Sequence, residues 1–258
     1  MANAWIIKPL PFVATSPHTA LGSPGNVALD YAGVIWRSIN TPYPNLFIDL
    51  GVDTAVDTVM LFGLAGGMAG GGIQIYASTA AEGTGSYPRS TFGDLLAGSS
   101  MPASGLGTSL FALPTAWPAV RYLRIEIGQT GSYIQVSRLV VNKRIALSRN
   151  FAFGAGFGVR DLGSLDFSAR GVMLRRRAAK LCTTALTFSN ARKDEVEATV
   201  KPMLEQIGNT ECVALVIDPD VNAQRMNRCY FGPLVGDLSV IWRNAAAWEA
   251  KVNLVSLF

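Results

Sequence analysis

The sequence predicts a mainly β protein with two domains, and three observations lead to this fold class. Short apolar runs rich in β-forming residues alternate with turn residues over the first 148 positions. The composition then changes, because 18 of the 26 glycines lie before this point and all three cysteines lie after it. Only one segment shows strong helical periodicity. We therefore expect an antiparallel β-sandwich over residues 1–148, followed by a β-rich α+β domain with one helical segment over residues 149–258.

The composition narrows the possible classes of protein to those with a large buried core. The chain has 258 residues, of which 49% are apolar and 16% are charged, whereas about 25% of an average soluble domain is charged. Such a chain buries a large core, which excludes disorder for most of its length. The low charged fraction further predicts a surface that is covered by neighbouring subunits in a permanent assembly.

An uncharged stretch over residues 58–81 raises the alternative of a membrane-spanning helix, because it is long enough to cross a bilayer. Six glycines lie within residues 63–72, and glycine is a poor helix former. We therefore predict a strand over residues 59–64, a glycine loop over 65–72 and a second strand over 73–78. Residues 1–10 have no sustained apolar run, so no signal peptide is predicted either.

Further strands are predicted from local apolar runs in the first half. In residues 121–127, Tyr122, Arg124 and Glu126 alternate with Leu123, Ile125 and Ile127, which indicates one buried and one exposed face. No amphipathic helix separates these runs, so an antiparallel sandwich is favoured over an α/β fold. The strands predicted here cover residues 47–50, 56–64, 73–78, 120–127 and 133–142.

A family resemblance rests on ordered landmarks within residues 20–145. Trp36-Arg37-Ser38 is followed by the runs at residues 44–51, 56–63, 73–78, 121–125 and 134–139. This order resembles discoidin-like domains, which are galactose-binding-like jelly rolls. The chain departs from that family in lacking a terminal disulfide and in having a long insertion at residues 85–108.

The resemblance implies glycan or lipid-headgroup binding through loops at one end of the sandwich. Tyr31, Tyr43 and Tyr87 are the candidate glycan contacts, although each ring could instead fill space in its turn. Trp36 is expected in the core. The family also implies a structural calcium ion near residues 26–34, where Asp30 is the only carboxylate. Because calcium usually takes six to eight oxygen ligands, Asp30 is a weak calcium candidate, and we otherwise predict no cofactor.

The second half contains the one helical segment. Ser189 is a candidate N-cap, and Val196, Val200, Leu204 and Ile207 recur on one face before Gly208. Pro202 interrupts this pattern, so we expect a kink or two short helices. Strands are predicted around this segment at residues 172–174, 181–188, 212–217, 228–234 and 242–254.

The order of elements after residue 150 resembles the ring-forming domains of tailed-bacteriophage distal tail and minor tail proteins. The resemblance rests on a basic strand pair, a helix that begins with acidic residues, a strand that reaches Asp218-Pro219, and the run Tyr230-Phe231-Gly232-Pro233-Leu234 before a strand containing Trp248. It implies a structural subunit that packs around a tail channel, with the discoidin-like half projecting outward.

A basic cluster comprises Arg175, Arg176, Arg177 and Lys180. On a strand, Arg175 and Arg177 face one way and Arg176 the other, so the run does not form one continuous patch. Contact with other subunits or with solvent is therefore favoured over nucleic-acid recognition, while a position lining a DNA channel stays open.

No catalytic residues are predicted. The only histidine, His18, lies in a loop rich in proline, serine and glycine, and the carboxylates of the first half show no recognisable pairing. The predicted function is a non-enzymatic virion protein of a phage tail tip or distal tail, assembled in the host cytoplasm as a homo-oligomer with other tail proteins. The alternative is a carbohydrate-binding, lectin-like adhesin. A membrane span and sequence-specific nucleic-acid binding are not expected.

Overall fold

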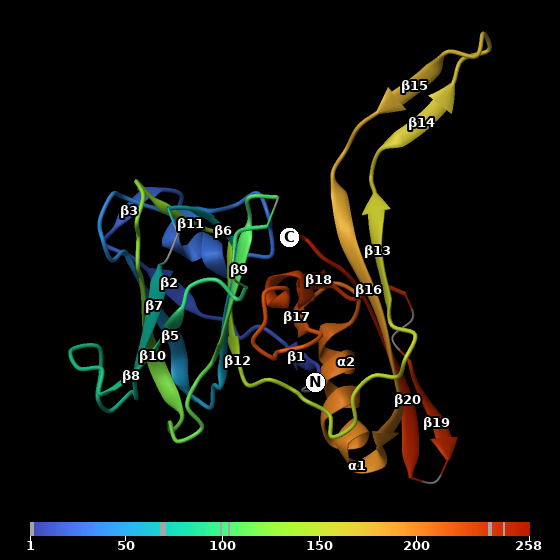
Figure 1. The fold of residues 1–258 in the computed structure, drawn as a ribbon. Coiled ribbons are helices and arrows are strands. Elements are labelled where there is room, and N and C mark those ends of the chain that lie inside the picture. Colours follow the sequence, from blue (N-terminus) through green and yellow to red (C-terminus); the bar gives the residue numbers. More distant parts are fainter. Residues whose placement is uncertain (1–2, 68–70, 99, 103, 237–238, 245) are drawn as a thin grey trace. The chain divides into compact units, whose positions relative to one another are not determined.

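The protein is mainly β, as predicted, in the computed structural model shown in Figure 1. The structure describes residues 3–67, 71–98, 100–102, 104–236, 239–244 and 246–258. It divides into two compact units. Unit 1 comprises Met1–Ala146 with Val213–Cys229, and unit 2 comprises Leu147–Cys212 with Tyr230–Phe258.

Two antiparallel sheets of unit 1 form the predicted sandwich. The first sheet has the order β2 (Val13–Thr15), β5 (Asn45–Thr54), β10 (Val120–Ile127), β7 (Gly72–Ser78) and β8 (Arg89–Asp94). The second has the order β12 (Arg138–Asn142), β6 (Thr58–Gly66), β11 (Ile134–Val136), β4 (Trp36–Ser38) and β3 (Thr19–Leu21), and β9 (Gly107–Ala112) also pairs with β6. A short 3-10 helix, η1, covers Pro24–Ala28.

The core of unit 1 lies between the apolar faces of these sheets. Leu123, Ile125 and Ile127 are fully buried, as the alternation along β10 predicts. They belong to one apolar cluster with Trp36 of β4 and Leu61 of β6. The expected core position of Trp36 is therefore confirmed.

The uncharged stretch at residues 58–81 forms strands β6 and β7, in agreement with the predicted strand, loop and strand. Part of the predicted glycine loop, residues 68–70, lies outside the described residues. In the part of the chain that the structure describes, no helix is both long and apolar enough to cross a membrane.

The segment 213–229 differs from the predicted division of the chain at residue 148, because it belongs to unit 1. Its strand β17 (Cys212–Val216) pairs antiparallel with β1 (Trp5–Ile7), and a 3-10 helix, η3, follows at Arg225–Arg228. All five residues of β17 are buried. This apolar strand therefore gains both burial and backbone hydrogen bonds in unit 1.

Unit 2 is built on a four-stranded antiparallel sheet and an extended hairpin (Figure 1). The sheet has the order β13 (Gly156–Asp161), β16 (Lys180–Arg192), β20 (Ala247–Val255) and β19 (Val240–Asn244). The hairpin consists of β14 (Ser164–Phe167) and β15 (Met173–Arg176), and it extends beyond the sheet. Strand β18 covers Cys229–Pro233.

The helical segment consists of α1 (Lys193–Glu195), a π-helical stretch η2 (Val196–Val200) and α2 (Lys201–Ile207). The π-helical stretch ends at Val200, and Pro202 is the second residue of α2, within the first turn, where a proline is tolerated. The kink expected at Pro202 stays a prediction. The predicted stripe of Val196, Val200, Leu204 and Ile207 is buried. Gly208, with φ of 55°, ends the helix.

The predicted N-cap at Ser189 is wrong. Strand β16 continues through this residue to Arg192, because Ala191 and Arg192 pair with Trp248 and Ala247 of β20. Backbone pairing within the sheet thus replaces the local capping interaction.

Candidate functional site

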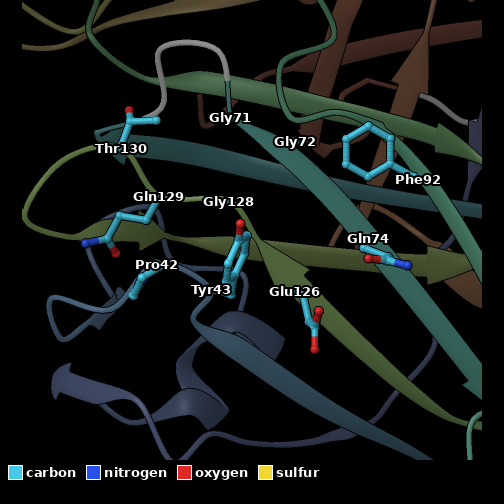
Figure 2. A pocket seen from close by; sticks show the side chains of 10 residues that line it. All are labelled: Pro42, Tyr43, Gly71, Gly72, Gln74, Phe92, Glu126, Gly128, Gln129 and Thr130. Atoms are coloured by element: carbon cyan, nitrogen blue, oxygen red, sulfur yellow. The ribbon is translucent and has the colours of Figure 1, made fainter.

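The clearest hollow on unit 1 is a groove of about 500 Å³ at one end of the outer face of the first sheet. Figure 2 shows its side chains, with Gln129 on one side, Phe92 on the other, and Tyr43, Glu126 and Gln74 between them. The lining is completed by Pro42, Gly71, Gly72, Gly128 and Thr130.

Strand register places three of these side chains in a row. Glu126 of β10 lies opposite Gln74 of β7, which lies opposite Phe92 of β8. Directly paired residues project from the same face of a sheet. The row therefore presents a carboxylate, an amide and an aromatic ring side by side on the face that points away from the core.

Tyr43 is held beside this row by the loop that precedes β5. The amide of Gln129 donates to the carbonyl of Pro42 at 2.9 Å, and the amide of Ile127 donates to the carbonyl of Pro44 at 3.1 Å. These two bonds fix the backbone on both sides of Tyr43 against the end of β10. Tyr43 is nevertheless 66% exposed.

Phe92 lies close to the backbone of Gly72. A Cβ atom added to Gly72 would come within 2.4 Å of the Phe92 ring, so only glycine at position 72 permits this ring position. Phe92 is 73% exposed. Tyr43 and Phe92 thus both lie beside the row with most of their surface accessible.

The polar groups of the groove differ in how far their hydrogen-bonding capacity is already used. Gln129 accepts from the Ser38 hydroxyl at 2.9 Å and donates to the Gly131 carbonyl at 2.7 Å, so it braces the loop. Glu126 accepts from the Tyr76 hydroxyl at 3.3 Å and pairs with Arg124 at 3.2 Å. Within the described residues, the Gln74 side chain has no hydrogen-bond partner.

Comparisons with known proteins give partial similarity only. No family model matches the sequence, and no curated protein matches it. Similar solved structures include the lectin domain of lectinolysin in complex with Lewis B antigen, with 15% identity, a TM-score of 0.37 and coverage of 51% of this chain and 92% of that one. A fucose-binding module of Streptococcus pneumoniae has 10% identity and a TM-score of 0.38, covering 51% and 90%.

A chitosan-binding module from a chitosanase/glucanase of Paenibacillus sp. IK-5 has 18% identity and a TM-score of 0.37, covering 52% of this chain and 95% of that one. These neighbours are carbohydrate-binding modules. At such identities and TM-scores, the likeness assigns no ligand to this chain. It also gives no support to a tail-protein identity, which stays a prediction from sequence.

Of the three predicted tyrosines, only Tyr43 lines the groove. Tyr31 is equally exposed but lies outside the lining. Tyr87 is partly buried, with the Arg124 guanidinium 5.2 Å from its ring centroid, and burial raises the pKa of its hydroxyl. Whether any of the three contacts a glycan stays a prediction. Gln74, Glu126 and Phe92 were not predicted, although the outward positions of Glu126 and Gln74 follow from strand alternation.

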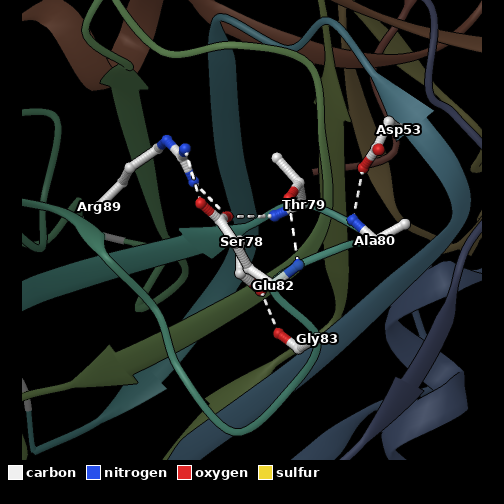
Figure 3. Close-up of polar contacts among 7 residues, drawn as sticks. All are labelled: Asp53, Ser78, Thr79, Ala80, Glu82, Gly83 and Arg89. Carbon is white, nitrogen blue, oxygen red and sulfur yellow. Dashed lines mark hydrogen bonds and ion pairs between the residues drawn. The ribbon is translucent and has the colours of Figure 1, made fainter.

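The turn that precedes Tyr87 is fixed by Glu82 (Figure 3). The Glu82 carboxylate accepts from the Thr79 amide at 2.8 Å and from Arg89 Nη2 at 3.0 Å. The Arg89 hydrogen bond is the larger cause, and with the Thr79 bond it lowers the Glu82 pKa from 4.5 to about 2. The turn also contains Gly83, with φ of 70°.

This network predicts a local acid transition. Because the pKa of Glu82 is depressed in the folded state, its ionised carboxylate stabilises this turn fully above about pH 4.5. This stabilisation is lost as the pH falls through about 2. An NMR titration of the Glu82 carboxyl should give a midpoint near 2, and the Thr79 amide shift should follow it. Arg89→Ala should move the midpoint toward 4.5, and a wild-type midpoint near 4.5 would contradict the network.

The calcium candidate Asp30 lies beside a buried arginine, and calcium binding there stays a prediction. Its carboxylate forms an ion pair with Arg138 Nε at 2.9 Å, and Arg138 Nη1 donates to the Val27 carbonyl at 3.0 Å. The nearby Ile35 carbonyl accepts from Asn26. A buried guanidinium thus already contacts one Asp30 carboxylate oxygen and the Val27 carbonyl. Among the described residues, no three His, Cys, Asp or Glu side chains cluster in a way that could hold a metal.

The predicted basic cluster lies in unit 2. Arg175 and Arg176 lie on β15, opposite Leu165 and Ser164 of β14 respectively, so their side chains project from different faces. All four residues, Arg175, Arg176, Arg177 and Lys180, are exposed. An inter-subunit or channel-facing role for them stays a prediction.

His18 stabilises a loop, and two of the three cysteines are buried. His18 Nδ1 accepts from the Asn45 amide at 3.2 Å and so ties its loop to the start of β5. Cys212 and Cys229 are buried, and burial raises the pKa of the Cys229 thiol to about 12. Cys182 is exposed.

Proposed function

We propose that unit 1 binds a glycan in the groove between Tyr43 and Phe92. The observation that supports this most is the row of Glu126, Gln74 and Phe92 beside the exposed Tyr43 ring. A sugar ring has apolar C–H faces and polar hydroxyl edges. Aromatic rings cover such apolar surface favourably, while the amide and carboxylate accept or donate hydrogen bonds at the edge. A few convergent polar groups beside aromatic rings are typical of small-ligand sites.

The ligand is expected to be a neutral glycan. Glu126 is the only charged residue among the described residues that line the groove, and the neighbouring Arg124 already pairs with it. An anionic sugar would meet the Glu126 carboxylate without an uncommitted cation nearby, which is unfavourable. Neutral hydroxyl groups can donate to this carboxylate, and hydrogen bonds to a charged group are the stronger ones.

We further propose binding without catalysis. Most glycoside hydrolases use two carboxyl groups that flank the scissile bond. In the described lining of the groove, Glu126 is the only carboxylate. A single carboxylate that is hydrogen-bonded to Tyr76 is suited to orienting a hydroxyl group rather than to acid–base work on two sides of a sugar.

The test is glycan-array screening of the full chain, followed by calorimetry with the best neutral ligand. Phe92→Ala and Tyr43→Ala should each weaken binding by roughly tenfold or more, by analogy with the loss of one aromatic ring from sites where nucleobases stack, which costs about 1–3 kcal/mol of binding free energy. Glu126→Gln should weaken binding less, because the amide keeps an acceptor.

Tyr31→Ala is the matched control, because Tyr31 and Tyr43 are both 66% exposed and only Tyr43 lines the groove. It should leave the affinity unchanged. An array without any binding, or equal losses for Tyr31→Ala and Tyr43→Ala, would overturn the proposal. Preferential binding of sialylated or uronic glycans would contradict the expected neutral ligand.

A second candidate is the role predicted from sequence, a structural subunit of a phage tail tip that assembles with itself and with other tail proteins. One structural observation favours an assembly role: the hairpin of unit 2 exposes many large apolar side chains. Purification from assembled particles, with detection of the chain by mass spectrometry, would test this candidate, and its absence from tails would count against it.

A further inference from the structure

The hairpin arm of unit 2, residues 156–182, is the largest described feature without a role in the groove. It comprises β13, β14, β15 and the first residues of β16. Eight of its large apolar side chains are exposed by half or more. They are Phe157, Val159, Leu162, Leu165, Phe167, Val172, Met173 and Leu174. Large exposed apolar patches usually mark interaction sites, so an element with this many exposed apolar side chains is expected to be covered by a partner.

The apolar side chains are organised by strand register. Phe167 lies opposite Met173, and Leu165 lies opposite Arg175, so these four side chains share one face of the hairpin. Within the sheet, Phe157 and Val159 of β13 lie opposite Thr184 and Cys182 of β16. Since alternate residues share a face, Phe157 and Val159 continue the face on which Leu186 and Phe188 are buried.

The arm is also strongly basic. It carries six basic residues, Arg160, Arg170, Arg175, Arg176, Arg177 and Lys180, and two acidic residues, Asp161 and Asp166. Its net charge of +4 equals the net charge of the whole chain. The remaining residues are therefore neutral in sum, and the excess positive charge is confined to this one element.

An acidic surface of the same chain complements the arm. Residues 193–211, which contain α1, η2 and α2, carry five carboxylates and two lysines. Of these carboxylates, Asp194, Glu197, Glu205 and Glu211 are exposed. The lysines neutralise part of this charge through pairs between Lys193 and Glu197 and between Lys201 and Glu205. The segment keeps a net charge of −3.

We propose that the arm of one copy docks on the acidic helical segment, residues 193–211, of a second copy of this chain. The arm and this segment are different surfaces, so the contact is heterologous and each copy can bind one neighbour at each surface. Apolar side chains of the arm would supply burial, and the opposite charges would fix the orientation and speed the encounter.

A second copy fits the arm better than a membrane does. Helices that lie on membranes keep their basic residues on a polar face, apart from the apolar face. In the arm, Arg175 lies on the face of Leu165 and Phe167, while Arg176 lies on the other face. Carboxylates of a protein partner can meet guanidinium groups on both faces, whereas a bilayer contacts one side.

The test begins with light scattering of the full chain over a wide concentration range at low and high salt. We expect concentration-dependent association that weakens at high salt, because opposite surface charges are screened. Leu165→Glu with Phe167→Glu should weaken association by at least about tenfold, since it removes two apolar contacts. Val221→Glu, at a position 87% exposed in unit 1, is the control and should leave association unchanged.

A charge-reversal pair makes the test specific to the two surfaces. Arg175→Glu with Arg177→Glu reverses charge on the arm, and Glu205→Arg with Glu211→Arg reverses it on the helical segment. Each variant alone should stay monomeric, and a mixture of the two should associate again. Circular dichroism would verify folding, and the accessibility of the exposed Cys182 thiol to a labelling reagent should fall on association.

The inference would be overturned if the wild-type chain stays monomeric at the highest concentration. It would also be overturned if Val221→Glu weakens association as much as the double substitution at Leu165 and Phe167, or if the mixture of charge-reversed variants stays monomeric. Binding of the arm to anionic vesicles or to heparin without self-association would also overturn it. Glycan binding measured on the same variants should be unchanged, so failure of this inference is distinguishable from failure of the proposed glycan site.

Discussion

Arg138→Ala should destabilise unit 1 by about 3 kcal/mol, the lower end of the range for breaking a buried ion pair. The Arg138 side chain is 5% exposed and pairs with Asp30, whose side chain is 32% exposed. Its Nη1 also donates to the Val27 carbonyl. Removal of the guanidinium leaves both oxygen atoms without this partner. Because Asp30 is partly solvated, solvent screens part of the loss.

Urea unfolding followed by circular dichroism would measure this change. Arg138→Lys is the control that keeps the charge, and it should lose less stability than Arg138→Ala because Asp30 keeps a cationic partner. It should still lose some stability, because an ammonium cannot reproduce the spread donors of a guanidinium. Added calcium should raise the midpoint of neither the wild type nor Arg138→Ala. Wild-type stability in Arg138→Ala, or a calcium-dependent rise in the wild type, would contradict the assignment of Arg138 as the resident cation.

Trp36→Ala should lower the free energy of unfolding by about 3–5 kcal/mol, which is the range for removal of a large aromatic side chain from a core. Trp36 is fully buried in the apolar cluster of unit 1, and its Nε1 donates to the Thr19 hydroxyl at 3.0 Å. The substitution therefore opens a cavity between the sheets and also leaves a hydroxyl without its donor. Both effects act in the same direction.

The same unfolding experiment would measure this loss. Trp242→Ala is the matched control, because Trp242 is exposed and stacks on Trp248 with ring centroids 5.4 Å apart. It should cost about 1 kcal/mol or less, as expected for a solvent-facing aromatic pair. Similar losses for Trp36→Ala and Trp242→Ala would show that Trp36 is not central to the core.

Much of the sandwich could be predicted from local sequence patterns, because a strand that is buried on one face has apolar residues at every second position. The alternation in residues 121–127 indicated both the strand and its buried face, and Ile73 and Ile75 of β7 follow the same rule. Strand β8 was missed, because its residues 89–94 lie in a region dominated by Gly, Ser and Pro. Strand β9 at residues 107–112 was missed because its stability comes from pairing with the distant strand β6.

The candidate site could be predicted only in part for the same reason. Tyr43 was recognisable as an aromatic residue in a turn-rich loop. Phe92 belongs to the missed strand β8, so neither its neighbour Gln74 nor its approach to Gly72 was visible locally. The row of Glu126, Gln74 and Phe92 exists only through the register of three strands that are distant in sequence. Register of this kind is a tertiary property, which single-strand patterns do not contain.

The pairing of β1 with β17 has a consequence for synthesis on the ribosome. Trp5 pairs with Val216, so more than 200 residues separate the two strands. Domains usually fold as they emerge, N-terminal part first, but unit 1 must wait for Val213–Cys229 before it is complete. Ile6 and Ile7, buried in the finished fold, stay without this partner strand during most of elongation. A nascent chain truncated before residue 213 should therefore bind chaperones more than one truncated after residue 229.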